Sequence, residues 1–80
     1  MITSNQIRAA RALIGLSQTA VAEAAEVSTM TLKRAEGSGR PAASADAIKA
    51  IRSALEHFGV EFIAENGGGA GVRLKKGDQT

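Results

Sequence analysis

The sequence predicts a mainly α fold that ends in a β-hairpin, and three observations point to it. Apolar residues recur at helical spacing over residues 1–58, and glycine, serine or proline interrupts them at intervals. Alanine is the most frequent residue, which favours closely packed helices because alanine has the highest helix propensity. After Gly59 the apolar period changes from that of a helix to the alternation of strands. A chain of 80 residues gives one core, so we expect one compact unit.

Four short helices fit residues 1–58. Thr3 and Gln6 have the spacing of a capping box, which starts the first helix, and Gly15 ends it because glycine enters the left-handed region without a steric penalty. Each of the other three helices has a serine at its N-cap position. These are Ser17 before residues 18–25, Ser28 before residues 29–36, and Ser44 before the longer helix that Gly59 stops.

Two alternating segments, 60–65 and 72–75, flank a glycine-rich turn and predict the hairpin. Alternation puts one apolar set on one face and a second set on another: Val60, Phe62 and Ala64, then Val72 and Leu74. A two-stranded hairpin is marginal alone, so it must pack on the preceding helix or pair with a second copy. We therefore expect a helical domain over 1–58, a hairpin over 59–76 that serves dimerisation, and a flexible tail over 77–80.

Composition excludes several classes of function. Without cysteine the chain has no disulfide scaffold and no thiol-based zinc site, and its one histidine, His57, cannot assemble a metal cluster or a catalytic triad. The glycine-rich segment 67–71 lacks the Lys-Ser/Thr of a phosphate-binding loop. No apolar run spans a bilayer and no signal segment opens the chain. We expect a soluble, cytoplasmic protein that is not an enzyme and holds no cofactor or metal.

Residues 17–25 and 28–36, joined by about three residues, have the dimensions of a helix-turn-helix. Ala22 supplies the small residue that such a unit needs where its helices cross. The positions at which the second helix packs on the first are apolar. The positions of the second helix that face outward are polar, cationic or flexible, which suits the reading of base edges in a major groove. The apolar set is Val21, Val27 and Leu32, and the outward set is Thr29, Met30, Lys33 and Arg34.

The run QTAVAEAAEVSTMTLKRAEG, residues 18–37, resembles the helix-turn-helix of the phage repressor and Cro (XRE-like) family, and IRAARALIGLSQ resembles the family's first helix. The resemblance covers residues 4–58, implies a repressor-like fold of four to five helices, and places the motif at 17–37. Two positions depart from the family pattern: Glu26 replaces the usual turn glycine, and Ala35 replaces a larger apolar residue.

The resemblance implies roles for individual residues. Gln18 would contact a DNA phosphate and brace the recognition helix. Arg40, in the following loop, would grip phosphates, and Arg11 and Glu36 would form an internal ion pair. The recognition positions are Ser28, Thr29, Met30, Lys33 and Arg34, with Lys33 and Arg34 directed to guanine edges or phosphates, Thr29 to a base or phosphate and Met30 to a thymine methyl group.

These roles have plainer alternatives. Lys33 and Arg34 could form an ordinary solvated face, Met30 could tuck against the preceding helix, and for Arg8 a solvated face is favoured over a phosphate contact. For dimerisation the sequence offers the fourth helix and the hairpin, with strand addition between copies as one route. The expected dimerisation residues are Leu55, Phe58, Val60, Phe62, Val72 and Leu74.

The function predicted is a sequence-specific regulator of transcription that binds double-stranded DNA, as a homodimeric repressor on a palindromic operator. The alternative is a protein-interaction module, antitoxin-like or an anti-activator, that grips another protein with its hairpin.

Overall fold

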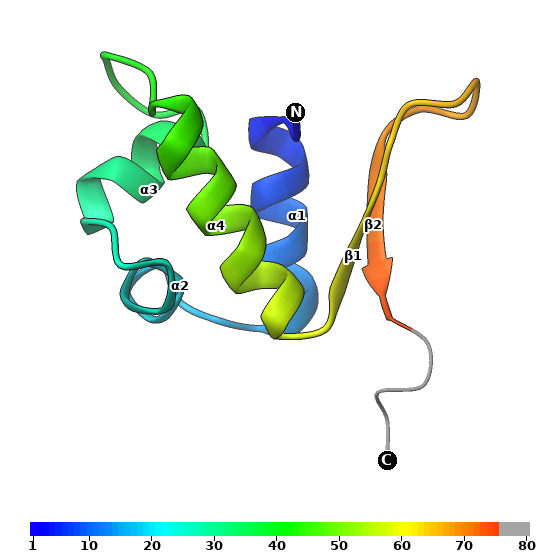
Figure 1. Cartoon of the computed structure of the whole chain (residues 1–80), viewed down its shortest axis with the longest axis horizontal. Helices are drawn as coiled ribbons and strands as arrows, with labels where there is room; N and C mark the ends of the chain where they lie inside the picture. The colour runs from blue at the N-terminus through cyan, green and yellow to red at the C-terminus, as the bar shows by residue number, and fades with distance from the viewer. Residues whose placement is uncertain (76–80) are drawn as a thin grey trace.

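The computed structural model describes residues 1–75 and shows four helices followed by an antiparallel hairpin (Figure 1). The mainly α fold with a C-terminal hairpin is therefore confirmed. The tail expected over 77–80, and residue 76 of the expected hairpin, lie outside the described residues. The elements are α1 (Ser4–Ile14), α2 (Gln18–Ala25), α3 (Thr29–Ala35), α4 (Ala45–His57), β1 (Val60–Ile63) and β2 (Gly71–Leu74).

Every helix begins at the cap that the sequence predicts. The Thr3 hydroxyl accepts from the Gln6 backbone N–H, and the Gln6 side chain accepts from the Thr3 backbone N–H, so the capping box is complete. The other three hydroxyls each accept from the backbone N–H three residues on, which satisfies a donor that the first helical turn leaves free. These are Ser17 to Ala20, Ser28 to Thr31 and Ser44 to Ala47, at 3.0–3.1 Å.

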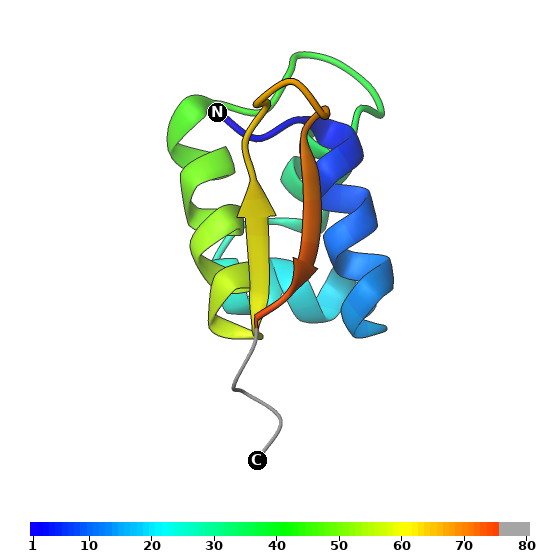
Figure 2. The ribbon, with the colours of Figure 1, turned by 90° about the vertical axis from the view of Figure 1, so that its right-hand side faces the viewer.

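The core lies between the helices and is closed on one side by the hairpin, which covers α1 and α4 (Figure 2). α4 packs against α2 and α3, so that every element except β2 contributes a fully buried side chain. These side chains are Ile7, Val21, Leu32, Ile51, Leu55 and Val60.

The hairpin register pairs Val60 with Leu74 and Phe62 with Val72, so the two apolar sets share one face. That face turns to the helices, since Phe62 and Val72 pack against the core. On the opposite face, Arg73 donates a hydrogen bond to Glu61 at 2.7 Å, which lowers the pKa of the Glu61 carboxyl.

Two of the residues expected at a dimer interface belong to the core instead. Leu55 is 0% exposed and Val60 is 2% exposed. The prediction is wrong for both, because α2, α3 and the hairpin pack against α4 within the one chain and bury these two side chains. Neither side chain can contact a second copy unless this core opens.

Two long-range contacts fasten the hairpin to the helices. The Gln6 amide nitrogen donates to the carbonyl oxygens of Ile63 and Gly71, at 3.2 and 3.0 Å. The Arg52 guanidinium lies 5.5 Å from the centre of the Phe62 ring, within the range of a cation–π interaction. Within residues 1–75, no helix has the length and hydropathy that crossing a membrane requires.

Candidate nucleic-acid interface

The turn between α2 and α3 depends on the backbone of Glu26. This residue adopts the left-handed conformation, with φ of 59°, and is the one non-glycine residue with positive φ in residues 1–75. The Val27 N–H then donates to the Ala22 carbonyl at 3.0 Å, and Ser28 caps the next helix. Glu26 thus takes the conformation that a glycine would adopt freely, and the departure from the family pattern leaves the reversal intact.

α3 buries one side and exposes the other. Leu32 and Ala35 face the core at 0% and 5% exposure, whereas Met30 is 57% exposed. The remaining recognition positions also reach solvent: Lys33 and Ser28 are exposed, and Thr29 and Arg34 are half-buried. α3 lies on the side of α4 away from the hairpin (Figures 1 and 2). All five expected recognition residues therefore share one region of the surface.

A buried carboxylate fixes the end of α3. Glu36, directly after the helix, is 4% exposed and accepts from Arg11 Nε at 2.7 Å and from Arg11 Nη2 at 3.2 Å. The Gln18 side-chain amide donates to the same carboxylate at 3.0 Å. These bonds join α1, α2 and the end of α3, and the hydrogen bond from Arg11 to Glu36 raises the pKa of Arg11. The ion pair that the resemblance implies is present, and we call these three side chains the Glu36 hub.

Arg8 has a contact that the sequence did not reveal. Its guanidinium donates to the Glu36 backbone carbonyl and to the Asn5 side chain, although the residue is exposed. A helix leaves its last carbonyls without intrahelical partners, so a cation at this point is favourable. No local pattern marks the contact, because it joins residues that only the tertiary fold brings together.

Two expected phosphate-binding residues differ in their surroundings. The Gln18 amide nitrogen is engaged with Glu36, which corresponds to its expected bracing role. Arg40 is exposed in the loop between α3 and α4.

The remaining expected dimerisation residues lie on the other side of the molecule. There, Phe58 and Leu74 are exposed, and Phe62 and Val72 are half-buried.

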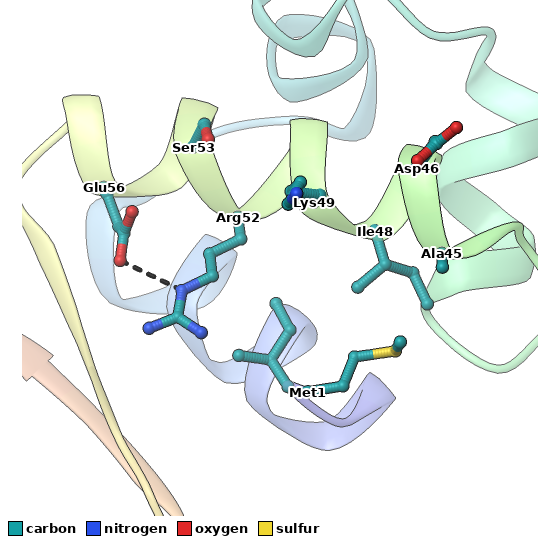
Figure 3. A pocket seen from close by; sticks show the side chains of 9 residues that line it. Met1, Ala45, Asp46, Ile48, Lys49, Arg52, Ser53 and Glu56 are labelled. Carbon is teal, nitrogen blue, oxygen red and sulfur yellow. Dashed lines mark hydrogen bonds and ion pairs between the residues drawn. The ribbon is translucent and has the colours of Figure 1, made fainter.

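A groove of about 610 Å³ lies between the N-terminal residues and α4 (Figure 3). The side chains of Met1 and Ile48 point toward each other across it. At one end Arg52 and Glu56 form a salt bridge of 3.1 Å, so the lining carries both signs of charge. Among the described residues, no group of three metal-ligating side chains comes together.

Neither a family model nor a curated protein matches the chain. Any function of the chain must therefore be inferred from the chemistry of its own residues, above all those on the surface of α3.

Proposed function

We propose that this chain is a cytoplasmic, sequence-specific regulator of transcription with a repressor-like fold, and that α3 is its recognition helix. The observation that carries the proposal is the division of α3 into two sides. One side is fastened by Leu32, Ala35 and the Glu36 hub, and the other presents Met30 and Lys33 to solvent. A helix about 10–12 Å across fits the major groove of B-form DNA, which is about 12 Å wide.

The exposed side chains have the chemistry that base reading requires. Lys33 and Arg34 can donate to guanine O6 and N7 or to phosphate oxygens, and Thr29 can bond a base edge or a phosphate. The Met30 thioether side chain is flexible and apolar, which suits contact with a thymine methyl group. Ser28 caps α3 with its hydroxyl, at the end of the helix that would enter the groove.

The Glu36 hub supports the proposal because base reading needs a recognition helix of fixed orientation. Side chains must be held within about 0.5 Å of their productive positions to discriminate among bases. Arg11 and Gln18 hold the carboxylate of Glu36, and Arg8 holds its carbonyl oxygen. The end of α3 is thus bound to both preceding helices.

A dimeric repressor on a palindromic operator is the form of the protein that we propose. One recognition helix covers few base pairs, and two copies with two-fold symmetry read half-sites about 34 Å apart. Phe58 is an exposed apolar side chain at the end of α4 that can form part of the dimer contact. Leu55 and Val60 are not part of it, since both are buried in the core.

The proposal is tested by selecting bound duplexes from a random DNA pool with the full chain and two variants. We expect the wild type to enrich a palindromic motif. Lys33→Ala should lose preference at particular base pairs and weaken binding to the motif about 10-fold, since one good base contact is worth about 1–3 kcal/mol. Lys49→Ala is the matched control, because it removes the same charge from an exposed site on α4. Enrichment of no motif, or equal effects of the two variants, would refute the proposal.

A further inference from the structure

The outer edge of β2 has unpaired backbone groups. Lys75 N–H donates to the Gly59 carbonyl at 2.7 Å, which makes Gly59 and Lys75 a hydrogen-bonded pair of the antiparallel ladder. Hydrogen-bonded and non-hydrogen-bonded pairs alternate along such a ladder, so the N–H and C=O groups of Val72 and Leu74 point away from β1. In residues 1–75, no side chain and no backbone group outside the hairpin bonds to them.

β2 is the more exposed of the two strands. The residues of β1 are buried or half-buried, and Arg52 lies over the Phe62 ring on that strand. On β2, Arg73 and Leu74 are exposed, Leu74 at 55%. An added strand would therefore meet the more accessible backbone groups on β2.

α1 provides an apolar floor next to this edge. The bond from Gln6 to Gly71 sets the two elements side by side, and they run in the same direction (Figure 2). Leu13 lies on the Gln6 face of α1, about two turns or roughly 10 Å further along. Leu74 lies roughly 10 Å along β2 from Gly71, at the same level. Leu13 is 43% exposed, and Ala9, one turn before it, is also exposed. We call the open edge of β2 with this floor the β2 shelf.

The geometry disfavours the addition of a second copy's hairpin to this edge. Neighbouring strands lie about 4.8 Å apart, but packed helices need about 8–10 Å. α1 and α4 already lie to the outside of the two strands (Figure 2). A four-stranded sheet made from two hairpins would be about 14 Å wide, whereas the four helices behind it would need at least roughly 24 Å. Strand addition between copies, which the sequence left open, is therefore sterically unfavourable.

The occupant must be a strand with no helix behind it, and the charge of the edge indicates its chemistry. In residues 1–75, Arg73 is paired with Glu61, whereas no salt bridge includes Lys75.

We propose that the β2 shelf binds an extended segment of another protein, which adds to β2 as a third strand. Backbone groups of Val72 and Leu74 bond the segment, its alternate apolar side chains lie on Ala9 and Leu13, and an acidic residue lies near Lys75. The shelf is on the side of the molecule away from α3, so this inference goes beyond DNA binding and does not depend on it.

The test uses a phage-displayed library of random octapeptides, panned on the full chain. Val72→Pro removes the outward N–H and leaves the β1–β2 bonds in place, and Val72→Thr is the matched control that keeps the N–H. We expect enriched peptides to alternate apolar and polar residues, to carry an acidic residue, and to bind Val72→Thr at least 10-fold more tightly than Val72→Pro. Amide resonances of Val72 and Leu74 should shift on binding.

Leu13→Glu is a second variant that leaves the strand backbone unchanged, and it should also weaken binding at least 10-fold. Failure to enrich peptides, or enriched peptides that bind all variants equally, would overturn the proposal. The proposal would also be overturned if, without peptide, the Val72→Pro variant sedimented differently from the wild type. The edge would then be part of a contact between two copies of the chain. If the wild-type protein does not bind DNA, the proposed function is overturned and this inference is unaffected.

Discussion

Glu26 holds the turn between α2 and α3 in a conformation that is unfavourable for its residue type. The left-handed region brings Cβ close to the following carbonyl oxygen, which costs a residue other than glycine about 1–2 kcal/mol. Glu26 has φ of 59° and an exposed side chain, and no salt bridge in residues 1–75 includes it. The free-energy cost at this position is therefore not offset by an ion pair of its own side chain.

Glu26→Gly should stabilise the protein by about 1 kcal/mol, since glycine relieves the steric cost and loses part of the gain through its more flexible unfolded chain. Denaturant unfolding followed by circular dichroism measures the difference. Glu26→Ala is the control, because alanine keeps Cβ in the same conformation and should give no comparable gain. Equal stabilisation by both variants would assign the effect to loss of charge.

The Glu36 carboxylate concentrates three side-chain hydrogen bonds in a buried position. Glu36→Gln should destabilise the protein by about 2 kcal/mol. The variant leaves the Arg11 charge without its counter-ion, and it places the new amide NH₂ group next to the donors of Arg11 and Gln18. Solvent at Arg11, which is 26% exposed, keeps the loss below that of a fully buried pair. Glu56→Gln, at the exposed pair with Arg52, should change the free energy of unfolding by less than about 0.5 kcal/mol.

At the scale of the elements, Gln6 joins the start of α1 to the hairpin. Glutamate is also common at this capping-box position, so the capping box by itself would tolerate Gln6→Glu. In the fold, however, the Gln6 amide nitrogen faces the carbonyl oxygens of Ile63 and Gly71.

Gln6→Glu should therefore cost about 2–3 kcal/mol, because a carboxylate would lose both donated bonds and repel both oxygens. Hydrogen exchange should accelerate at the hairpin amides. Asn5→Asp adds the same charge in the same helical turn, at an exposed position that already accepts from Arg8, and is expected to be neutral or slightly stabilising. Equal losses from both variants would contradict the role given to the amide nitrogen.

The sequence predicts those elements whose limits depend on local chemistry. A serine or threonine hydroxyl bonds its own helix three residues on, so Thr3, Ser17, Ser28 and Ser44 mark the helix starts without knowledge of the fold. Contacts across the chain could not be found in this way. Arg8 and Gln6 reach partners that lie far off in sequence, and no local period encodes their direction.

For the whole molecule, the apolar pattern of α4 and the hairpin shows which side chains become buried. It does not show whether the same chain or a second copy buries them. The same pattern fits a core within one chain and an interface between two. Leu55 and Val60 belong to the core, and Phe58 and Leu74 remain exposed. The choice depends on how closely the other elements of the same chain pack against α4, which a local pattern does not specify. The face of α3 that we propose for base reading is easier to predict, because the buried side of α3 fixes which residues point outward.

DNA affinity of the whole molecule should fall with salt, because each neutralised phosphate releases counterions and adds about −0.9 to the slope of log affinity against log salt concentration. Arg40→Ala should weaken binding to every sequence and reduce the magnitude of that slope by about 1, since Arg40 is an exposed cation in the loop after α3. Fluorescence anisotropy at several salt concentrations measures both. A loss confined to particular base pairs would assign Arg40 to base reading instead.

One amide group both caps the first turn of α1 and bonds the two strands where the connection 64–70 joins them, so opening at these two places is coupled. When the first turn of α1 opens, the bonds to Ile63 and Gly71 are lost, and when these strand ends move away, the amide that caps the turn is released. Proteolysis within residues 64–70 should therefore make the N-terminal residues easier to cut.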